Sequence, residues 1–313
     1  MHLTLRQLKV FEAVARHLSF RRAAEELHLS QPAVSMQIKQ LEANVELPLF
    51  DHVGKKVFLT EAGHEMFHYS RAIADLLNET DEVIEQLKGG RRGKLTLSVA
   101  STVNYFAPAL LSTFCQRFPD INISLDVTNR ETLLRQLADN EADLVIMGQP
   151  PAGEDLEAGA FMENPLVIIA PPDHPLAGER RVPLQRLEDE TFLVRERGSG
   201  TRGATERFFS QHGITLNAGM EVSSNEAIKQ SVQAGLGLGL LSRDTLEMEL
   251  ALNRLVVLDV EGFPIVRHWY VMHRRAKRLS PVAQAFKRFL LEEANTLLHP
   301  ELPAGGVSAV AEE

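Results

Sequence analysis

The chain has 313 residues, of which 44% are hydrophobic and 24% charged, and it contains a single cysteine, Cys115. This length and composition predict about two soluble domains with hydrophobic cores, and they exclude a disulfide-stapled miniprotein and, because no run of about 18 apolar residues is present, a membrane protein. The start of the chain lacks the apolar run of a secretory signal, which predicts a cytoplasmic protein, and the net charge of −9 argues against a nucleic-acid partner if that charge is evenly spread.

The charge is unevenly distributed along the sequence. Residues 1–60 contain eight Lys and Arg against six Asp and Glu, a net charge of +2, whereas residues 61–93 contain four against seven, a net charge of −3. Residues 94–313 contain the remaining 21 against 29, a net charge of −8. A mildly basic head therefore precedes an acidic body, and a head of this sign permits binding to phosphate groups.

The first 45 residues are predicted to form three helices. Ser19 and Ser30 are typical N-cap residues, and Pro32 is tolerated in the first turn of a helix that runs from about residue 31 to residue 45. The three-residue turn 28–30 separates this helix from the one before it. This order of elements predicts a helix-turn-helix.

A small hairpin and a long helix follow. Residues 49–51 and 57–60 read as two short strands around a basic tip, and residues 61–88 then show an uninterrupted helical pattern, which ends at the glycines of 89–93. The apolar seam of this helix consists of Met66, Tyr69, Ile73, Leu76, Thr80, Val83 and Leu87. A heptad seam of this kind predicts pairing with a second copy of the chain. The alternative is that the same face packs on its own domain.

From residue 94 onward, short apolar strands alternate with helices, and the alternation then repeats. The predicted strands are 95–100, 121–127, 144–147, 166–170, 192–194, 219–222, 238–241 and 268–273, and the predicted helices are 105–118, 131–140, 201–212, 225–234 and 281–298. This pattern predicts two α/β subdomains with parallel sheets, joined by crossings near Ala170 and Arg267. The tail 299–313 is predicted to be disordered.

Two features of residues 1–60 favour DNA binding. Short polar side chains at the start of the third helix can reach base edges in the major groove, and basic side chains of the second helix and the hairpin can contact phosphates. These candidate DNA-binding residues are Arg21, Arg22, Ser30, Gln31, Pro32, Ser35, Gln37, Lys39, Lys55 and Lys56. The alternative is a solvated helix face in a helical domain that binds protein.

Residues 64–68, His-Glu-Met-Phe-His, match the H-E-x-x-H signature of zinc hydrolases, so an enzyme is the competing hypothesis. A hydrolytic zinc site also needs a third protein ligand and a concave pocket. In the heptad register above, His64 and His68 fall on the outer surface of the helix, which favours coincidence over a metal site.

Ligand chemistry is expected in the crevice between the subdomains, at the carboxyl ends of strands. Hydroxyl, amide and guanidinium groups follow four of the predicted strands, and a glycine-containing loop lets its backbone approach a ligand. The candidate effector-binding residues are Ser101, Thr102, Thr128, Asn129, Arg195, Ser199, Gly200, Thr201, Arg202, Ser223, Ser224 and Asn225. Taken singly, each segment is better explained by helix capping. Gly235–Gly239 precedes a strand rather than a helix, which predicts close packing and not a dinucleotide turn.

The head resembles the LysR-type transcriptional regulators. The matching residues are, in order, Leu5–Leu8, Phe11, Ser19–Phe20, Ala23–Ala24, Leu29–Ser35, Ile38, Leu41–Glu42, Leu49–Phe50 and Leu59–Gly63. Two positions depart from the pattern, because Met36 and His52 stand where many members carry Arg; both are counted as candidate DNA contacts.

The resemblance implies an α/β protein with an N-terminal all-α winged helix-turn-helix domain at 1–60 and a dimerising linker helix at 61–93. It also implies an effector-binding domain at 94–298 that resembles type 2 periplasmic binding proteins, with subdomain I at about 94–169 and 268–298 and subdomain II at about 170–267. A transport-type solute-binding protein would explain the crevice but not the head.

The implied partners are double-stranded promoter DNA and further copies of the chain, as a dimer and usually a tetramer, with RNA polymerase as a further candidate and no membrane. No cofactor or catalysis is implied, and an activator role is expected. The strings Arg195–Arg202 and Ser224–Gln230 resemble the CbbR-type branch, which controls carbon-fixation operons and responds to phosphorylated or carboxylated metabolites.

Overall fold

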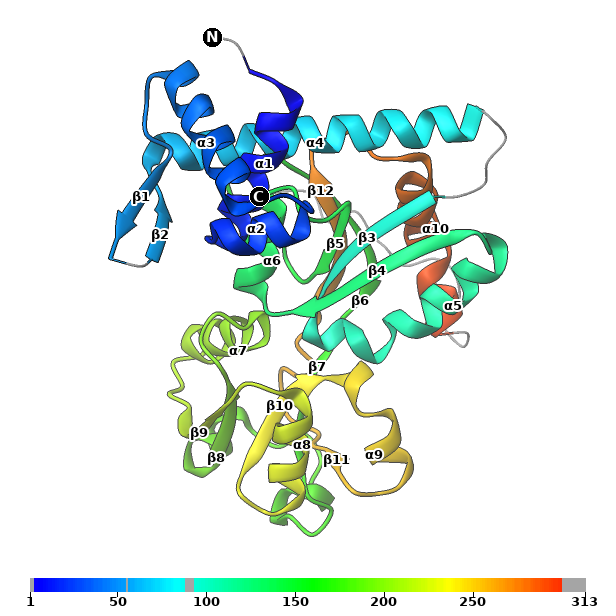
Figure 1. Cartoon of the computed structure of the whole chain (residues 1–313). Helices are drawn as coiled ribbons and strands as arrows, with labels where there is room; N and C mark the ends of the chain where they lie inside the picture. Colours follow the sequence, from blue (N-terminus) through cyan, green and yellow to red (C-terminus); the bar gives the residue numbers. More distant parts are fainter. Residues whose placement is uncertain (1–2, 55, 88–92, 300–313) are drawn as a thin grey trace. The chain divides into compact units, whose positions relative to one another are not determined.

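The computed structural model describes residues 3–54, 56–87 and 93–299 (Figure 1), and the chain divides into two units, Met1–Gly90 and Arg91–Glu313. Within the described ranges, no helix is both long enough and apolar enough to cross a membrane. The predicted disordered tail lies outside the described residues apart from His299, which caps the last helix.

The helices of the first unit begin where the sequence predicts. Helix α1 spans Leu5–His17, α2 spans Phe20–Glu26 and α3 spans Gln31–Val45. The side chains of Ser19 and Ser30 accept hydrogen bonds from backbone amides in the first turns of α2 and α3. Because first-turn amides have no partner inside the helix, these caps fix the start of each helix.

The hairpin is anchored to α3. Strands β1, Phe50–Val53, and β2, Lys56–Leu59, pair in antiparallel fashion, close to the predicted ranges. The carboxylate of Glu42 on α3 accepts hydrogen bonds from the backbone amides of Leu49 (2.8 Å) and Phe50 (3.3 Å). The rings of Phe50 and Phe11 lie 5.2 Å apart in the core of this unit. One carboxylate therefore holds the entry to the hairpin against the helix-turn-helix.

The long helix α4 spans Glu61–Leu87 and divides into two parts by exposure. Near its start, Met66 is half-buried against the core of its own unit, as the alternative interpretation of the seam predicts. Farther along, Tyr69 and Leu76 are 60% and 61% exposed. The side chains of Val83 and Leu87 and the residues 88–92 lie outside the described part of the chain.

The second unit contains two sheets. The first has the order β4-β3-β5-β12-β6, formed by Ile121–Thr128, Gly93–Ala100, Leu144–Met147, His268–Arg274 and Leu156–Glu163. Helices α5, Ala107–Arg117, and α10, Pro281–Leu298, pack on one face, and α6, Arg130–Ala138, packs on the other. A short 3-10 helix, η1, Ser101–Tyr105, follows β3.

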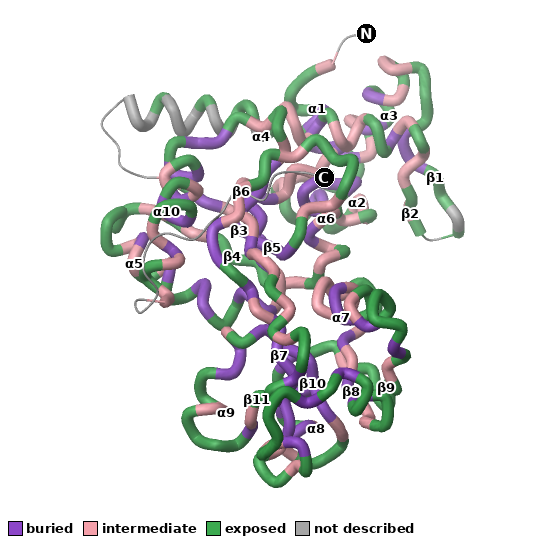
Figure 2. The backbone as a smooth tube through the Cα atoms, turned by 180° about the vertical axis from the view of Figure 1, so that it is seen from behind, coloured by how far each residue is buried: buried purple, intermediate pink, exposed green. Residues whose placement is uncertain are grey.

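The second sheet has the order β11-β7-β10-β8-β9, formed by Val256–Val257, Leu166–Ala170, Leu238–Ser242, Thr191–Arg195 and Asn217–Val222. Helices α7, Gly200–Gln211, and α8, Asn225–Gln233, belong to its two separate cores. Strands β5, β7 and β10 are buried along their whole length (Figure 2). A Cβ at Gly239 would lie 2.9 Å from Ile228 and 3.1 Å from Val232, so this glycine permits the close packing predicted for its segment.

Two expectations about these sheets are wrong. Strand β7 belongs to the second sheet and not to the first. The first sheet is completed by β6, a strand that the sequence did not predict. The chain therefore crosses to the second subdomain at residues 164–165 rather than near Ala170. The sheets are also mixed rather than parallel, since β12 runs antiparallel to β5 and β6, and β7 runs antiparallel to β10. Only two of the eight residues of the edge strand β6 are fully buried, so its sequence has no continuous apolar run that would predict a strand. The short elements α9, Glu247–Ala251, and β11 were also missed.

Candidate functional site

The start of α3 presents an exposed polar surface. Gln31 and Pro32 are exposed and Met36 is 62% exposed, whereas Ile38 and Val34 on the opposite side are buried in the core. Ser35 and Gln37 are partly exposed and Lys39 is exposed. A helix held by its inner face, with short polar side chains outside, can enter a major groove.

The predicted phosphate contacts also lie at the surface. Arg21 and Arg22 on α2 are exposed, and among the described residues the ion pair of Arg21 is a long contact of 3.7 Å with the exposed Glu25. His52 is exposed and its ring stacks on Phe20 at 5.9 Å. Lys56 is exposed, whereas the predicted contact Lys55 lies outside the described residues.

A further cluster of polar and charged side chains joins α1 to α2. Arg16 donates to Glu26 at 2.6 Å, and His17 lies 2.6 Å from the other oxygen of the same carboxylate. The hydrogen bond from Arg16, with that from His17, lowers the pKa of Glu26 below its ordinary value. The carboxylate of Glu26 therefore stays ionised, and its negative charge is paired with the guanidinium of Arg16.

The H-E-x-x-H segment lies on the surface of α4. His64 and Glu65 are exposed, and His68 is half-buried with its ring 5.4 Å from that of Tyr69. Among the described residues, no group of three or more His, Cys, Asp or Glu side chains could hold a metal ion. The zinc hypothesis therefore finds no third ligand in the described part of the chain.

A buried guanidinium lies between the two subdomains of the second unit. Arg195 ends β8 and is 4% exposed. Its Nε and Nη2 donate to the carboxylate of Glu196 at 2.7 and 2.9 Å, its Nη1 donates to Oδ1 of Asn225, and its Nη2 contacts the hydroxyl of Ser101 at 3.4 Å. A buried charge requires such partners, because an unpaired one would be costly to desolvate.

Asn225 extends this network to the other subdomain. Its side-chain nitrogen donates to the hydroxyl of Thr102 at 3.1 Å, and both residues are buried. Thr102 lies in η1 after the first sheet, whereas Asn225 and Arg195 belong to the second. Asn225 therefore joins the two subdomains through a pair of hydrogen bonds.

Around Arg195 lies a narrow cavity between the subdomains, here called the inner cleft, with a volume of about 40 Å³. Eight of the twelve predicted effector residues line it: Ser101, Thr102, Thr128, Asn129, Arg195, Ser199, Gly200 and Thr201. The structure thus brings residues from three of the four predicted segments to one place.

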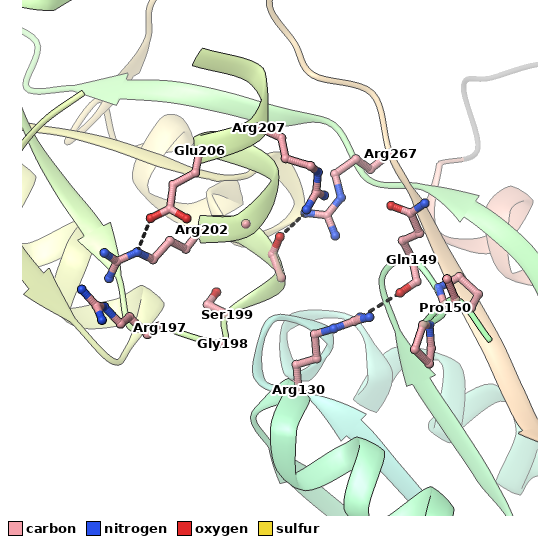
Figure 3. Close-up of a pocket in the computed structure, with 14 residues that line it drawn as sticks. Arg130, Gln149, Pro150, Arg197, Gly198, Ser199, Arg202, Glu206, Arg207 and Arg267 are labelled. Atoms are coloured by element: carbon pink, nitrogen blue, oxygen red, sulfur yellow. Dashed lines mark hydrogen bonds and ion pairs between the residues drawn. The ribbon is translucent and has the colours of Figure 1, made fainter. Parts of the chain in front are cut away.

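The other four predicted residues do not line the inner cleft. Asn225 lies behind it, the hydroxyl of Ser224 caps α8, and Ser223 contributes a carbonyl oxygen 3.5 Å from Arg195. Arg202 turns away, where its Nε donates to Glu206 at 2.7 Å (Figure 3) and its Nη1 to Glu221. The helix of α7 directs successive side chains to different sides, so adjacent residues cannot all face one cleft.

Other residues that line the inner cleft escaped prediction. Asn164 is 2% exposed and its Oδ1 has no hydrogen-bond partner among the described residues. Trp269 lines the cleft and donates to Asp244 at 3.4 Å. Glu196, Arg130 and Arg267 line it as well. Asn164 sits in the crossing whose position was misjudged, so no local pattern could have singled it out.

Two family models match the chain. One, "Bacterial regulatory helix-turn-helix protein, lysR family", matches residues 5–64, and the other, "LysR substrate binding domain", matches residues 88–295. A RuBisCO operon transcriptional regulator of Allochromatium vinosum is 62% identical over 94% of this chain and 97% of its own length. The regulator CbbR of Rhodospirillum rubrum is 48% identical over 93% of this chain and 97% of its own length.

Solved structures are also similar. The regulatory domain of CcmR from Synechocystis, in complex with 2-PG, is 45% identical with a TM-score of 0.62, and the match covers 64% of this chain and 96% of that domain. Full-length CbnR in complex with its target DNA has a TM-score of 0.66 at 21% identity, with 93% of this chain and all of that one covered. At this identity the second likeness shows the fold alone.

Proposed function

The chain belongs to the LysR family of bacterial transcriptional regulators, and we propose that it binds promoter DNA of carbon-fixation genes under the control of a small phosphorylated or carboxylated anion. Relatives that are 62%, 49% and 48% identical are named as regulators of the RuBisCO operon or as CbbR, which supports this choice of genes. Promoter DNA as the partner supports action in the cytoplasm. A relative from Synechocystis is named a transcriptional activator, which supports an activating role.

The observation that carries the effector hypothesis is the hydrogen-bonded link from Arg195 through Asn225 to Thr102 at the inner cleft. It brings a guanidinium to a cavity lined by both subdomains. Neither η1 nor α7 has a side-chain cap, so their first-turn amides are available to an oxyanion near Ser101 and Gly200. The 45% identity to a regulatory domain solved with 2-PG supports 2-phosphoglycolate as a probe of this site.

The size of the inner cleft determines how such a ligand would act. About 40 Å³ holds only a few water molecules, so a phosphorylated metabolite fits only if the subdomains separate and then close on it. Binding shifts the equilibrium between arrangements in proportion to the difference in affinity for them. The effector therefore acts by selecting one arrangement of the two subdomains.

DNA binding is assigned to the first unit. The exposed start of α3 reads base edges, and Arg21, Arg22 and Lys56 neutralise phosphates. With few cations in each head, two heads are needed for stable binding, and the exposed Tyr69 and Leu76 on α4 support pairing through that helix. A tetramer and a contact with RNA polymerase complete the proposal.

DNA titration at several salt concentrations tests the phosphate contacts. The logarithm of the association constant should fall linearly with the logarithm of salt concentration, because each neutralised phosphate releases counterions. An association constant that does not change with salt would overturn this model of the head.

The effector hypothesis is tested by titrating the full chain with 2-phosphoglycolate while following its fluorescence. The single tryptophan, Trp269, lines the inner cleft, so its emission should change when a ligand binds there. Ser101→Ala and Thr201→Ala should each weaken binding about tenfold, because each removes a hydrogen bond to a charged group. Thr113→Ala, which removes a hydroxyl on α5 that lines no described cavity, serves as the control. Unchanged binding in both cleft variants would contradict the assignment.

A further inference from the structure

Helix α3 exposes one face along its whole length. The exposed residues of this helix are Gln31, Pro32, Met36, Lys39, Gln40 and Ala43. They follow the three- and four-residue spacing of a helix face, whereas Val34, Ile38 and Leu41 lie on the opposite side, in the core of the first unit. The exposed face is the one that the proposed function turns toward the bases of DNA.

Met36 is a large apolar side chain in the middle of this face. It is 62% exposed, and among the described residues the hydrophobic side chains that form or pack against the core of the first unit do not include it. The packing of the first unit therefore gives no reason for a methionine at this position. Isolated apolar side chains are common on protein surfaces, so the case depends on what surrounds Met36 and on what its face contacts.

The exposed Pro32 lies one helical turn before Met36 on the same face. Side chains of a helix lean toward its N-terminus, so the side chain of Met36 is directed back over the turn that contains Pro32. At 1.5 Å per residue, the two Cα atoms are about 6 Å apart along the helix axis, which is less than two base-pair steps of about 3.4 Å each. The two residues therefore form a short apolar strip that can face one or two base pairs.

The charge of α3 allows this strip to approach DNA closely. Glu42 is the one acidic residue of α3, all of whose residues the structure describes, and its carboxylate faces the hairpin, where it accepts hydrogen bonds from the backbone amides of Leu49 and Phe50. Lys39, three residues beyond Met36, is exposed. The exposed face of α3 is therefore neutral or positive, as contact with a polyanion requires.

We propose that Met36 is a specificity-determining residue that recognises the 5-methyl group of a thymine in each half-site, the stretch of DNA that one head contacts. The edges of base pairs in the major groove present hydrogen-bond donors and acceptors, and the thymine methyl is the apolar group among them. Methionine has no donor and its thioether is a weak acceptor, so it is suited to the methyl and not to the polar groups. Its unbranched side chain also adapts to an irregular surface. This inference rests on the proposed DNA binding by α3 and adds the base that one of its residues reads.

The probe for this inference is a duplex that the full chain itself selects from a pool of random sequences. Each thymine of its half-sites is then replaced in turn by deoxyuridine, which forms the same base pair and lacks only the methyl group. At the position that Met36 reads, the replacement should weaken binding about fourfold in each half-site, as expected for the loss of one buried methyl group. Electrophoretic mobility shifts measure the affinities.

Met36→Gln identifies the residue that makes the contact. Glutamine has nearly the length of methionine and a similar helix propensity, and the position is exposed, so the variant should keep the wild-type melting temperature. It should bind the thymine and uracil duplexes equally at that position, whereas Met36→Leu, which keeps an apolar side chain, should retain the preference for thymine. The matched control is Met248→Gln, at a methionine on α9 that is 74% exposed, and it should discriminate as the wild type does.

The outcomes separate this inference from the proposed function on which it rests. Equal binding of the thymine and uracil duplexes by the wild type at every position overturns the role of Met36 and leaves DNA binding standing, because the duplex was selected by the protein. Persistence of every thymine preference of the wild type in Met36→Gln overturns it as well. Failure of the full chain to select any duplex overturns the proposed DNA binding itself, and this inference with it.

Discussion

The two units of this protein present charge in opposite ways. In the first unit the candidate contacts lie at the surface of locally capped helices and a hairpin, all between residues 21 and 56. In the second, the central contacts join residues that are 94 and 123 positions apart, and their charges are buried against specific partners. Exposed cations suit a long polyanion that is contacted at many points, whereas a buried guanidinium network suits a small anion that must be enclosed.

This difference predicts that a substitution can destabilise one unit and leave the other intact. The largest effect of this kind is expected for Gly63→Ala in the first unit. A Cβ at Gly63 would lie 2.1 Å from the backbone oxygen of Leu49, so α4 would have to move away from the hairpin. Overpacking of this kind should lower the free energy of unfolding of the first unit by about 3 kcal/mol. We expect loss of DNA binding and an early thermal transition, while 2-phosphoglycolate binding is retained.

The control for this experiment is Gly178→Ala in the second unit, where nothing lies within 4 Å of the added Cβ. Its transitions should match those of the wild type. If Gly63→Ala also abolished 2-phosphoglycolate binding, the two units would not be independent.

Asn225→Ala is the corresponding change in the second unit. It removes the acceptor of Nη1 of the buried Arg195 and the donor to the hydroxyl of the buried Thr102, which should cost about 2 kcal/mol of unfolding free energy and weaken 2-phosphoglycolate binding. DNA affinity without effector should be unchanged. Asn217→Ala, which removes an exposed asparagine with one long hydrogen bond of 3.5 Å, is the matched control, and equal loss of stability in both variants would argue against the network.

The same difference explains what could be predicted from the sequence. Ser19 and Ser30 act within three residues of themselves, so the helix starts of the first unit follow from local chemistry. In the second unit, strand ends with free hydroxyls were recognisable, and Ser101, Thr128 and Thr201 do meet in one cleft.

The residues that were missed depend on sheet topology. Asn164 and Arg267 reach the inner cleft because both crossings between the subdomains pass beside it, and they are 103 residues apart. The sequence predicts Arg202 in the cleft because its neighbours are there, yet the turn of α7 directs it away from the cleft, toward Glu206 and Glu221. Side-chain direction on a helix and the order of strands are set by long-range packing, which no short motif encodes.

A smaller effect is expected for Gln31→Ala at the start of α3. If Gln31 reads a base edge, its loss should weaken binding to the operator by about 1.5 kcal/mol, roughly tenfold, and leave binding to unrelated DNA unchanged. Electrophoretic mobility shifts with operator and unrelated duplexes measure both. The control is Gln185→Ala, an exposed glutamine of the second unit. Equal losses on both duplexes would show that Gln31 contacts only the backbone.

The smallest effect is expected for Lys56→Gln on the hairpin. Lys56 is exposed and forms no ion pair with a described residue, so its charge is free to meet a phosphate. Its loss should weaken binding to operator and unrelated DNA alike by less than about 1 kcal/mol and reduce the salt slope by about one. Lys94→Gln, at an exposed position of the acidic second unit, should leave the slope unaltered. If the salt slope fell equally in both variants, the second unit as well as the first would contact DNA. The division of charge between the two units would then not explain where DNA binds.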